Sequence, residues 1–312
     1  MSPRQTLLLL LLHVLGTLCL PILLVGVVNR TKSWWGGRKG PSLTQSFRDL
    51  ARLLRKGSVV SATATPLFRA GAWVVLASAL LAAQIAPWIG PLAPLQFRHD
   101  FILFAYTLGL ARIFLMLSAM DVGSAFEGMG AAREAAFTAF IEPALFLLVG
   151  SAAIGSGDAS LAGSIGHWHA ASSFPWLAVP AVLVLLVLLQ AEAARVPVDD
   201  PATHLELTMI HEVMVLDHSG PELAAMQYAA AIKLTIYAGL IAALLNPFDA
   251  QQAPMSATAA AIALMIAVAI AVGCVESLVA RLRMRTVPAY LLSATVLAAL
   301  MLAVSSWLTE AR

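Results

Sequence analysis

The chain has 312 residues, of which 60% are hydrophobic and 12% charged, with a mean hydropathy of +0.85 and a formal net charge of +2. Soluble domains carry about 25% charged and about 45–50% apolar residues. The composition therefore excludes a soluble enzyme, a disordered chain and a nucleic-acid-binding protein with a basic domain. Because Cys19 and Cys274 both lie in apolar runs, the chain offers neither a disulfide framework nor an iron–sulfur ligand set. We predict an all-α polytopic integral membrane protein.

Apolar stretches of about 20 residues, long enough to cross the hydrocarbon core, occur eight times. The predicted spans are 6–28, 70–89, 101–120, 135–154, 174–192, 223–246, 256–276 and 286–308, which together form one membrane domain, 1–312. The first span resembles a signal peptide, but its apolar run is too long and no small-residue cleavage motif follows, so we expect a retained helix. Pro143, Pro180 and Pro288 are tolerated because neighbouring helices can satisfy the freed carbonyl groups.

Lysine and arginine residues are distributed unequally between the two sides of this arrangement. The connection after the first span holds nine of them, and the connections after the third, fifth and seventh spans hold five more. The opposite side holds three, namely Arg4, Arg98 and Arg312. Since connections rich in these residues stay in the cytoplasm, we expect both termini to lie outside a bacterial or archaeal inner membrane.

The first connection also contains an amphipathic segment, residues 42–56. Its apolar residues follow the spacing i, i+4, i+7, i+11 of one helical face: Leu43, Phe47, Leu50 and Leu54. Its basic residues lie on the other faces: Arg48, Arg52, Arg55 and Lys56. The pattern predicts a helix lying flat in the membrane interface, with its arginines toward lipid headgroups or a protein partner. Simple adhesion to the membrane is the alternative.

The connection at 192–222 is the richest in titratable groups, with seven of the seventeen acidic residues and three of the seven histidines. Asp200 and Pro201 predict the start of a helix over 201–217. In that helix the histidines would lie on one side at intervals of seven residues: His204, His211 and His218. Neighbouring histidines would then be roughly 10 Å apart, too far to share one metal ion. The other side would carry Glu206 and Asp217, which suits a water-filled path or an interface, or else an ordinary solvated helix. The opposite connection at 155–166 reads as a Gly/Ser-rich loop.

Ionisable residues within the spans carry a cost, because a charge at the bilayer centre is unfavourable by about 2.5–3.5 kcal/mol. Arg112, Glu142 and Lys233 lie inside spans, and Glu192 and Glu276 lie at span ends. They form either structural ion pairs, such as Arg112 with Glu142, or a proton relay. The chain lacks the residue patterns of nucleophilic catalysis and of nucleotide binding. We therefore expect no bond chemistry of its own, and a substrate that is an ion, a lipid-soluble molecule or another protein.

Three segments resemble a known family. They are EAARVPVDDPATHLELTMIHEVMVLDHSGPELA, RKGPSLTQSFRDLARLLRK and SAMDVGSAFEGMGAAREAAFTAFIEPALFLL, and with other motifs they cover about half of the chain. They resemble the membrane subunit of formate hydrogenlyase and of related energy-converting nickel–iron hydrogenases. These proteins share a superfamily with the quinone-channel membrane subunit of respiratory complex I, which has the same eight-span layout.

The resemblance can be carried over residue by residue. The complex I pattern A-E-x-x-R-x-P-x-D-x-P is matched by Ala191, Glu192, Arg195, Pro197, Asp199 and Pro201. The pattern R-x-G-P, then Q, then D is matched by Arg38, Gly40, Pro41, Gln45 and Asp49. Glu142 matches the acidic residue of the fourth-span motif, and Asp217-His218-Ser219-Gly220 resembles the later E-Y-S-G.

The chain also departs from the complex I pattern. Ala202 and His204 replace an acidic pair, and the stretch before Ser219 is about three residues longer. The glycines and the arginine that the pattern has between Pro41 and Gln45 are absent. Those regions help to form the quinone chamber of complex I, so the departures count against a bound quinone and favour the hydrogenase branch.

The resemblance implies an anchor and coupling subunit that docks a peripheral arm and links its redox chemistry to proton or sodium movement. The implied partners are hydrogenase large and small subunits, iron–sulfur subunits and antiporter-like membrane subunits, which would hold the nickel–iron and iron–sulfur centres; this chain would hold no metal or cofactor. The candidates for the proton path are Glu142, Glu192, Asp199, Asp200, Glu206, Glu212, Asp217, Lys233 and Arg112. The candidates for docking are Arg38, Gln45, Arg48, Asp49, Arg52, Arg55 and Arg195.

Two alternatives stay open at this stage. A quinone-binding subunit of a complex I-type NADH dehydrogenase is the nearer one. A stand-alone secondary transporter would usually show internal repeats and broken-helix pairs, and neither is visible in the sequence.

Overall fold

The computed structural model describes residues 3–168, 174–200 and 209–310, and this part of the chain forms helices and no β-strand. The helices are α1 (Pro3–Trp35), α2 (Gln45–Leu54), α3 (Pro66–Ile85), α4 (Asp100–Asp121), α5 (Ala125–Ser156), α6 (Leu161–Trp168), α7 (Phe174–Glu192), α8 (His211–Met214), α9 (Gly220–Leu245), α10 (Pro254–Leu278) and α11 (Val287–Glu310). Seven are long and apolar enough to span a membrane, and α7 is a shorter apolar helix at the fifth predicted span. The predicted all-α polytopic membrane fold is confirmed.

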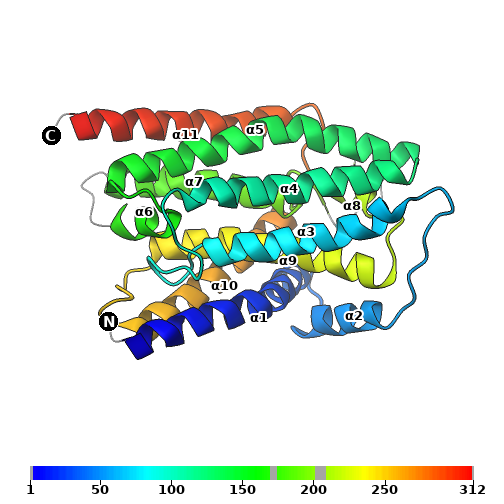
Figure 1. Cartoon of the computed structure of the whole chain (residues 1–312), viewed down its shortest axis with the longest axis horizontal. Helices are drawn as coiled ribbons and strands as arrows, with labels where there is room; N and C mark the ends of the chain where they lie inside the picture. The colour runs from blue at the N-terminus through cyan, green and yellow to red at the C-terminus, as the bar shows by residue number, and fades with distance from the viewer. Residues whose placement is uncertain (1–2, 169–173, 201–208, 311–312) are drawn as a thin grey trace.

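The long helices run up and down in one elongated bundle (Figure 1). Both termini and α6 lie at one end of it, while α2, α8 and residues 193–200 and 209–219 lie at the opposite end (Figure 1). We call this opposite end the loop end. Because the number of crossings is even, both termini fall at the same end. The first, third, fifth and seventh connections, which the sequence predicts on the basic side, therefore lie at the loop end.

Helix α9 forms the core of the bundle. In its most apolar window 83% of the residues are buried, compared with no more than 44% in any of the other six long helices. It packs against α1, α3, α7 and α10, whereas α5 pairs with α11 and α3 with α4 along the outside. A charge on α9 is therefore enclosed by protein on all sides, and it needs a partner from a neighbouring helix.

The helix ends at the loop end are tied to one another by polar contacts. The Asp121 carboxylate accepts hydrogen bonds from the backbone N–H of Thr65 at 2.7 Å and from its hydroxyl at 2.8 Å. The Thr65 hydroxyl in turn accepts from the N–H of Leu67 in the first turn of α3, where Pro66 needs no partner. These contacts join the start of α3 to the end of α4.

The structure corrects four sequence-based expectations. The loop predicted at 155–166 contains the start of α6, and α5 begins at Ala125, so Arg133 and Glu134 lie in a helix rather than in a connection. Pro288 lies in the first turn of α11 instead of inside a span. The helix predicted over 201–217 is wrong where it can be compared: residues 201–208 lie outside the described residues, and beyond them only His211–Met214 is helical.

The amphipathic helix predicted at 42–56 is confirmed as α2, with shorter bounds. Phe47 and Leu54 on its apolar face remain 59% and 58% exposed, while Leu50 packs closer to the bundle. A helix with an exposed apolar face is unfavourable in water, so its position at the end of the spans suits the membrane interface.

Candidate functional site

The last residue of α7, Glu192, occupies the centre of a buried charge cluster. Its side chain has no solvent exposure, and its two carboxylate oxygens face different cations. Oε2 accepts a hydrogen bond from Nζ of Lys233 on α9 at 3.2 Å, and Oε1 lies 3.4 Å from Nη2 of Arg112 on α4. One carboxylate therefore links two buried cations that come from separate helices.

Arg112 extends this cluster to a second acid. Its Nη2 lies 3.2 Å from Oε1 of Glu142 on α5, so the pairing considered from the sequence is present. The Arg112 side chain is 2% exposed and that of Glu142 is 45% exposed. Within the part of the chain that the structure describes, no nitrogen of the guanidinium group completes a hydrogen bond. Arg112 is thus held by charge at its two acids while its donors remain unused.

Glu134 is an acid that the sequence analysis assigned to a connection and left out of the candidates. It lies on α5 and interacts electrostatically with Lys233 and Arg112. Its sequence signal is the spacing of eight residues to Glu142, which puts both acids on similar sides of one helix. The predicted span begins at 135, whereas α5 continues through that position and includes Glu134. The cluster thus contains Glu134, Glu142 and Glu192 with Arg112 and Lys233.

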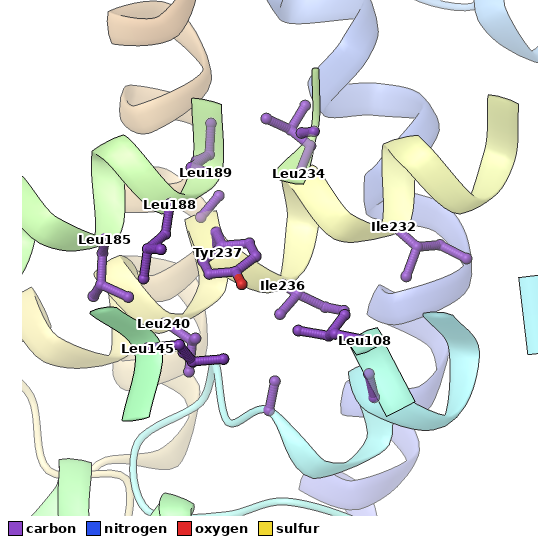
Figure 2. Close-up of a cluster of buried hydrophobic side chains, with 14 of the residues drawn as sticks. Leu108, Leu145, Leu185, Leu188, Leu189, Ile232, Leu234, Ile236, Tyr237 and Leu240 are labelled. Carbon is purple, nitrogen blue, oxygen red and sulfur yellow. The ribbon is translucent and has the colours of Figure 1, made fainter. Parts of the chain in front are cut away.

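Toward the terminal end of the bundle, the cluster borders an apolar layer. Tyr237 lies one turn beyond Lys233 on α9, and its buried hydroxyl has no hydrogen-bond partner among the described residues. Figure 2 shows its ring surrounded by leucine and isoleucine side chains from several helices. They are Leu108, Leu145, Leu185, Leu188, Leu189, Ile236 and Leu240. This layer separates the charges from the other end at the centre of the bundle.

Toward the loop end, the cluster continues into His211 and Glu212 of α8. His211 interacts electrostatically with Lys233 and Glu192, and burial lowers its pKa to about 4, with the Lys233 charge adding to the effect. Burial raises the pKa of Glu212 to about 7, helped by Asp199 and opposed by Arg195. A carboxyl group with this pKa exchanges protons near neutral pH, as a proton carrier must.

Asp199 organises the backbone around these residues. Its carboxylate accepts hydrogen bonds from the N–H groups of Asp200, Ile210 and His211 at 3.0, 3.2 and 2.8 Å. It also pairs with Arg281 at 2.9 Å. Burial raises its pKa, and the N–H donors and Arg281 oppose that rise. Asp199 therefore fixes α8 against the irregular segment that follows α7.

A cavity of about 330 Å³ opens beside α8, between α1, α2 and α9. Its titratable lining residues are Lys32, Asp49, Arg195, His211 and Glu212. A second cavity of about 320 Å³ lies on the membrane side of α2 and shares Ile22 and Leu50 with the first. Its lining is apolar and includes Phe47, Leu54, Trp73 and Leu76. A polar chamber thus adjoins an apolar one beneath the amphipathic helix.

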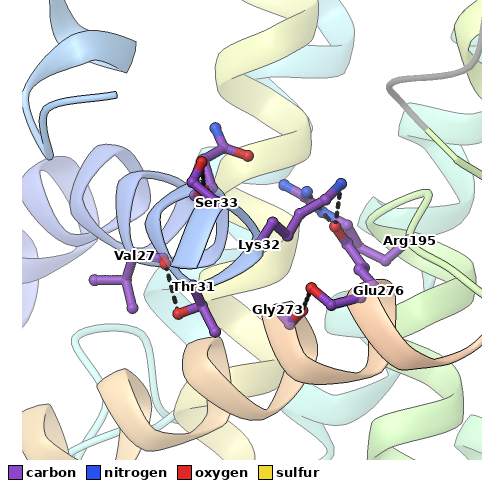
Figure 3. Close-up of polar contacts among 9 residues, drawn as sticks. Val27, Thr31, Lys32, Ser33, Arg195, Gly273 and Glu276 are labelled. Carbon is purple, nitrogen blue, oxygen red and sulfur yellow. Dashed lines mark hydrogen bonds and ion pairs between the residues drawn. The ribbon is translucent and has the colours of Figure 1, made fainter. Parts of the chain in front are cut away.

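A second ion-pair group joins two residues of the polar cavity's lining, Lys32 and Arg195, through Glu276 (Figure 3). The fully buried Glu276 carboxylate at the end of α10 pairs with Nζ of Lys32 at 2.8 Å and with Nη1 of Arg195 at 3.4 Å. Glu276 is not among the proton-path or docking candidates predicted from the sequence. The sequence signal for this pair is Lys32, which lies near the end of another span. A buried carboxylate such as Glu276 requires a cation at the same membrane depth.

The docking candidates divide into two groups. Six lie in α2 or next to it in the same connection and are exposed or half-buried. Four of these six bond to one another: Gln45 donates to Asp49 at 2.9 Å, Arg48 donates to Gln45 at 2.9 Å, and Arg52 pairs with Asp49 at 3.4 Å. Arg195 differs from them, since its side chain is only 10% exposed and pairs with Glu276.

The remaining candidates for the proton path lie away from the cluster or outside the residues that the structure describes. Glu206 is outside the described residues, and Asp217 is exposed, with its N–H donating to the buried Glu127 at 3.2 Å. A separate ion pair forms nearby, where the exposed Arg69 donates to the buried Glu222 at 2.7 Å. His218, expected on a solvated helix, is instead buried, with its ring 3.9 Å from that of Phe68.

These features define a multi-pass membrane protein with a buried charge network beside a loop-end cavity, and the chain belongs to the NADH dehydrogenase family, whose family model matches residues 7–307. It is 28% identical to hydrogenase-4 component C of Escherichia coli over 75% of this chain and 74% of that protein. It is 26% identical to formate hydrogenlyase subunit 4 of the same organism over 85% of this chain and 88% of that protein. The resemblance drawn from the motifs is confirmed.

The fold also recurs in a solved structure. A chain in the membrane-bound sulfane sulfur reductase, an archaeal respiratory membrane complex, superposes with a TM-score of 0.81 at 20% sequence identity. The match covers 96% of this chain and 99% of that chain, so the whole fold is shared.

Proposed function

We propose that this chain is the membrane anchor and coupling subunit of an energy-converting hydrogenase complex of the formate hydrogenlyase type. The observation that carries the proposal is the series of ion pairs Glu142–Arg112–Glu192–Lys233, which begins at the half-exposed Glu142 on the outer surface of α5 and is otherwise buried. It continues through His211 of α8, which lines the loop-end cavity. The hydrogenase-4 and formate hydrogenlyase relatives supply the class of complex.

The geometry supports coupling because one acid serves two cations. If Glu192 takes up a proton, Arg112 and Lys233 lose their common counter-charge while both remain buried. Lys233 then loses its ion-pair partner, and Arg112 keeps only the half-exposed Glu142, so the repulsion between the two buried cations is less well compensated. The cluster then lowers its energy by drawing the Arg112 charge toward Glu142. A change in protonation at the α8 side is therefore transmitted to α5 without movement of a helix.

The exposure of Glu142 is evidence for a neighbouring membrane subunit on the α5 side. Its carboxylate lies near the middle of α5, half-exposed on the outer surface of this chain. Contact with hydrocarbon would be costly for a charged carboxylate. An adjacent membrane subunit that covers α4 and α5 with a polar group at this depth removes that cost, and it receives the charge displacement. Antiporter-like subunits are the proposed partners, with proton or sodium as the ion moved.

The loop end is the proposed docking surface for the peripheral arm. Arg48, Arg52 and Arg55 are exposed on α2, next to the opening of the polar cavity. Hydrogenase large and small subunits and iron–sulfur subunits would dock here and hold the metal centres. In this arrangement the loop end faces the cytoplasm and both termini face outward, in agreement with the Lys and Arg distribution.

A quinone-binding subunit is a second candidate, favoured by one observation. The apolar cavity under α2 leads to the polar cavity through Ile22 and Leu50, which suits a ligand with a polar head and an apolar tail. A quinone extracted in stoichiometric amount from the purified complex would favour this candidate. Purification of the chain without partner subunits would instead favour a stand-alone transporter.

The proposal is tested by removing the central carboxylate in a charge-balanced way. Glu192→Gln alone leaves two buried cations and is expected to impair assembly, so the informative variant is Glu192→Gln with Lys233→Met. We expect this double variant to assemble and evolve hydrogen, while ion movement measured in membrane vesicles falls. The matched control is Asp249→Asn, an exposed acid at the terminal end. Ion movement equal to wild type in an assembled double variant would contradict the coupling role.

A further inference from the structure

The C-terminal end of α1 carries a hollow that is separate from the charge cluster and from the two cavities beside α2, and of the residues discussed above only the docking candidate Arg38 lines it. It has a volume of about 290 Å³ and is lined by Arg30, Thr31, Trp34, Arg38 and Lys39. Three of these five residues are cations, and none of the three forms an ion pair with an acid in the described part of the chain. The hollow therefore presents concentrated positive charge without an internal counter-charge.

A tight reversal of the chain builds this hollow. After α1 ends at Trp35, Gly37 and Gly40 adopt left-handed conformations with φ of +66°, which favour glycine. The N–H of Arg38 donates to the Ser33 carbonyl at 2.8 Å, and a Cβ at Gly40 would lie 2.5 Å from that of Ser33. The segment 38–40 is thus folded back against the last turns of α1, which brings Arg38 and Lys39 beside Arg30.

The position along α1 places the hollow at the level of lipid headgroups. With 33 residues, α1 is about 50 Å long, compared with about 30 Å of hydrocarbon. Its last turns extend beyond the apolar core, next to the end of α10, where Trp35 donates to Cys274 at 3.2 Å. Trp34 is 78% exposed, as is typical of tryptophans that anchor in the interface.

We propose that this hollow binds the phosphate group of an anionic phospholipid. Arginine side chains match phosphate oxygens with paired hydrogen bonds, and lysine adds a point charge. The exposed indole of Trp34 would lie against the glycerol and upper acyl region, which a free phosphate ion does not have. Basic pockets at the ends of membrane helices recognise such headgroups. The bound lipid would hold the end of α1 in register with the membrane surface, independently of the charge network.

The test compares two charge-matched double variants of the purified complex. Arg38→Gln with Lys39→Gln removes two cations from the hollow, whereas Arg55→Gln with Lys56→Gln removes two exposed cations from the same connection outside it. Each complex is equilibrated in bilayers of phosphatidylcholine that contain phosphatidylglycerol as the anionic lipid. The complex is then extracted with detergent and washed, and the lipid that stays bound is counted by mass spectrometry.

We expect wild type and the Arg55/Lys56 variant to retain phosphatidylglycerol and the Arg38/Lys39 variant to lose it. Each cation near an anionic surface contributes roughly a fivefold effect, so affinity should fall by between about fivefold and thirtyfold. Equal loss in both variants, or retention in both, would overturn the proposal. Release of the lipid by millimolar inorganic phosphate would show that phosphate alone is recognised and would overturn the lipid assignment. Trp34→Ala should weaken lipid retention, and the lipid that remains bound should still not be released by inorganic phosphate.

Discussion

Oε1 of Glu142 lies 3.2 Å from Nη2 of Arg112, yet the acid is 45% exposed and the arginine 2% exposed. The pair therefore joins the interior of the bundle to its outer surface. Arg112 also faces Glu192 at 3.4 Å, so it keeps one carboxylate when the other is removed. Because of this second contact, Glu142 can be removed without leaving Arg112 unpaired, so a variant at Glu142 can distinguish a structural role from a role in coupling.

We expect Glu142→Gln to assemble normally and to lower ion movement by about tenfold or more, because a positioned proton carrier contributes roughly 10²–10⁴-fold to a transfer step. Hydrogen evolution and membrane potential are measured together in vesicles, with Glu310→Gln as a control on an exposed acid. If Glu142 is only structural, the single variant loses yield and adding Arg112→Leu restores it. Normal assembly with undiminished coupling would remove Glu142 from both roles.

The ion-pair group of Glu276 provides a prediction about stability. Glu276→Gln leaves Lys32 and Arg195 without their common carboxylate at the wall of the cavity. Loss of one partner of a buried pair costs about 3–5 kcal/mol, and the 26% exposure of Lys32 brings the expected cost to about 2–3 kcal/mol. The midpoint of thermal unfolding of the solubilised complex should fall. A midpoint equal to that of wild type would show that the group is dispensable for stability.

The segment around α8 should respond to pH through Glu212. Its folded-state pKa of about 7 is above the ordinary value of 4.5, so the stabilisation is complete below about 4.5 and decreases as the pH rises through 7. His211 acts oppositely: its pKa of about 4 means that its contribution is complete above 6.5 and is lost as the pH falls toward 4.

Amide hydrogen exchange of residues 209–216 measures this response after correction for intrinsic rates. Between pH 6.5 and 8, where His211 is neutral, we expect wild type to lose on the order of 1 kcal/mol of local protection. Glu212→Gln should be flat over that range. A decline of the same size in the variant would assign the pH response to another group.

Docking of the peripheral arm should depend on the basic face of α2. Replacing Arg48, Arg52 and Arg55 together by glutamine should weaken attachment at low salt, since exposed charges are screened over about 8–10 Å near physiological ionic strength. Co-purification of arm subunits is compared at low and high salt. Attachment that is equally strong in both versions at every salt concentration would leave α2 with membrane adhesion alone.

The proposed orientation is tested by accessibility of single cysteines in a background lacking Cys19 and Cys274. The substitutions are Ser61→Cys in the connection between α2 and α3 and Gln251→Cys in the connection between α9 and α10, and both positions are exposed. An impermeant thiol reagent added outside intact cells should label position 251 and fail at position 61 until the cells are opened. The reverse pattern would invert the topology.

The sequence by itself determined the membrane class and the approximate position of all eight apolar helices. The physical reason is local: a bilayer requires about 20 consecutive apolar residues that satisfy their own backbone, and this requirement is written in each segment separately. The spacing of Leu43, Phe47, Leu50 and Leu54 likewise predicted α2, because an amphipathic face is a property of one helix. The motifs around Glu192 and Glu142 identified the family for the same reason.

Only the tertiary structure decided how the charges are paired and how residues 209–219 fold. Glu276 meets Lys32 across 244 positions of sequence, and Arg112 faces Glu142 and Glu192 from two other helices. Several partners at equal membrane depth are possible for each such residue, and helix packing selects among them. The helix expected through Asp217 does not form at 215–217, where His218 is instead buried against Phe68. Local propensity yields there to long-range packing, since burial of a residue depends on neighbours that the local sequence does not contain.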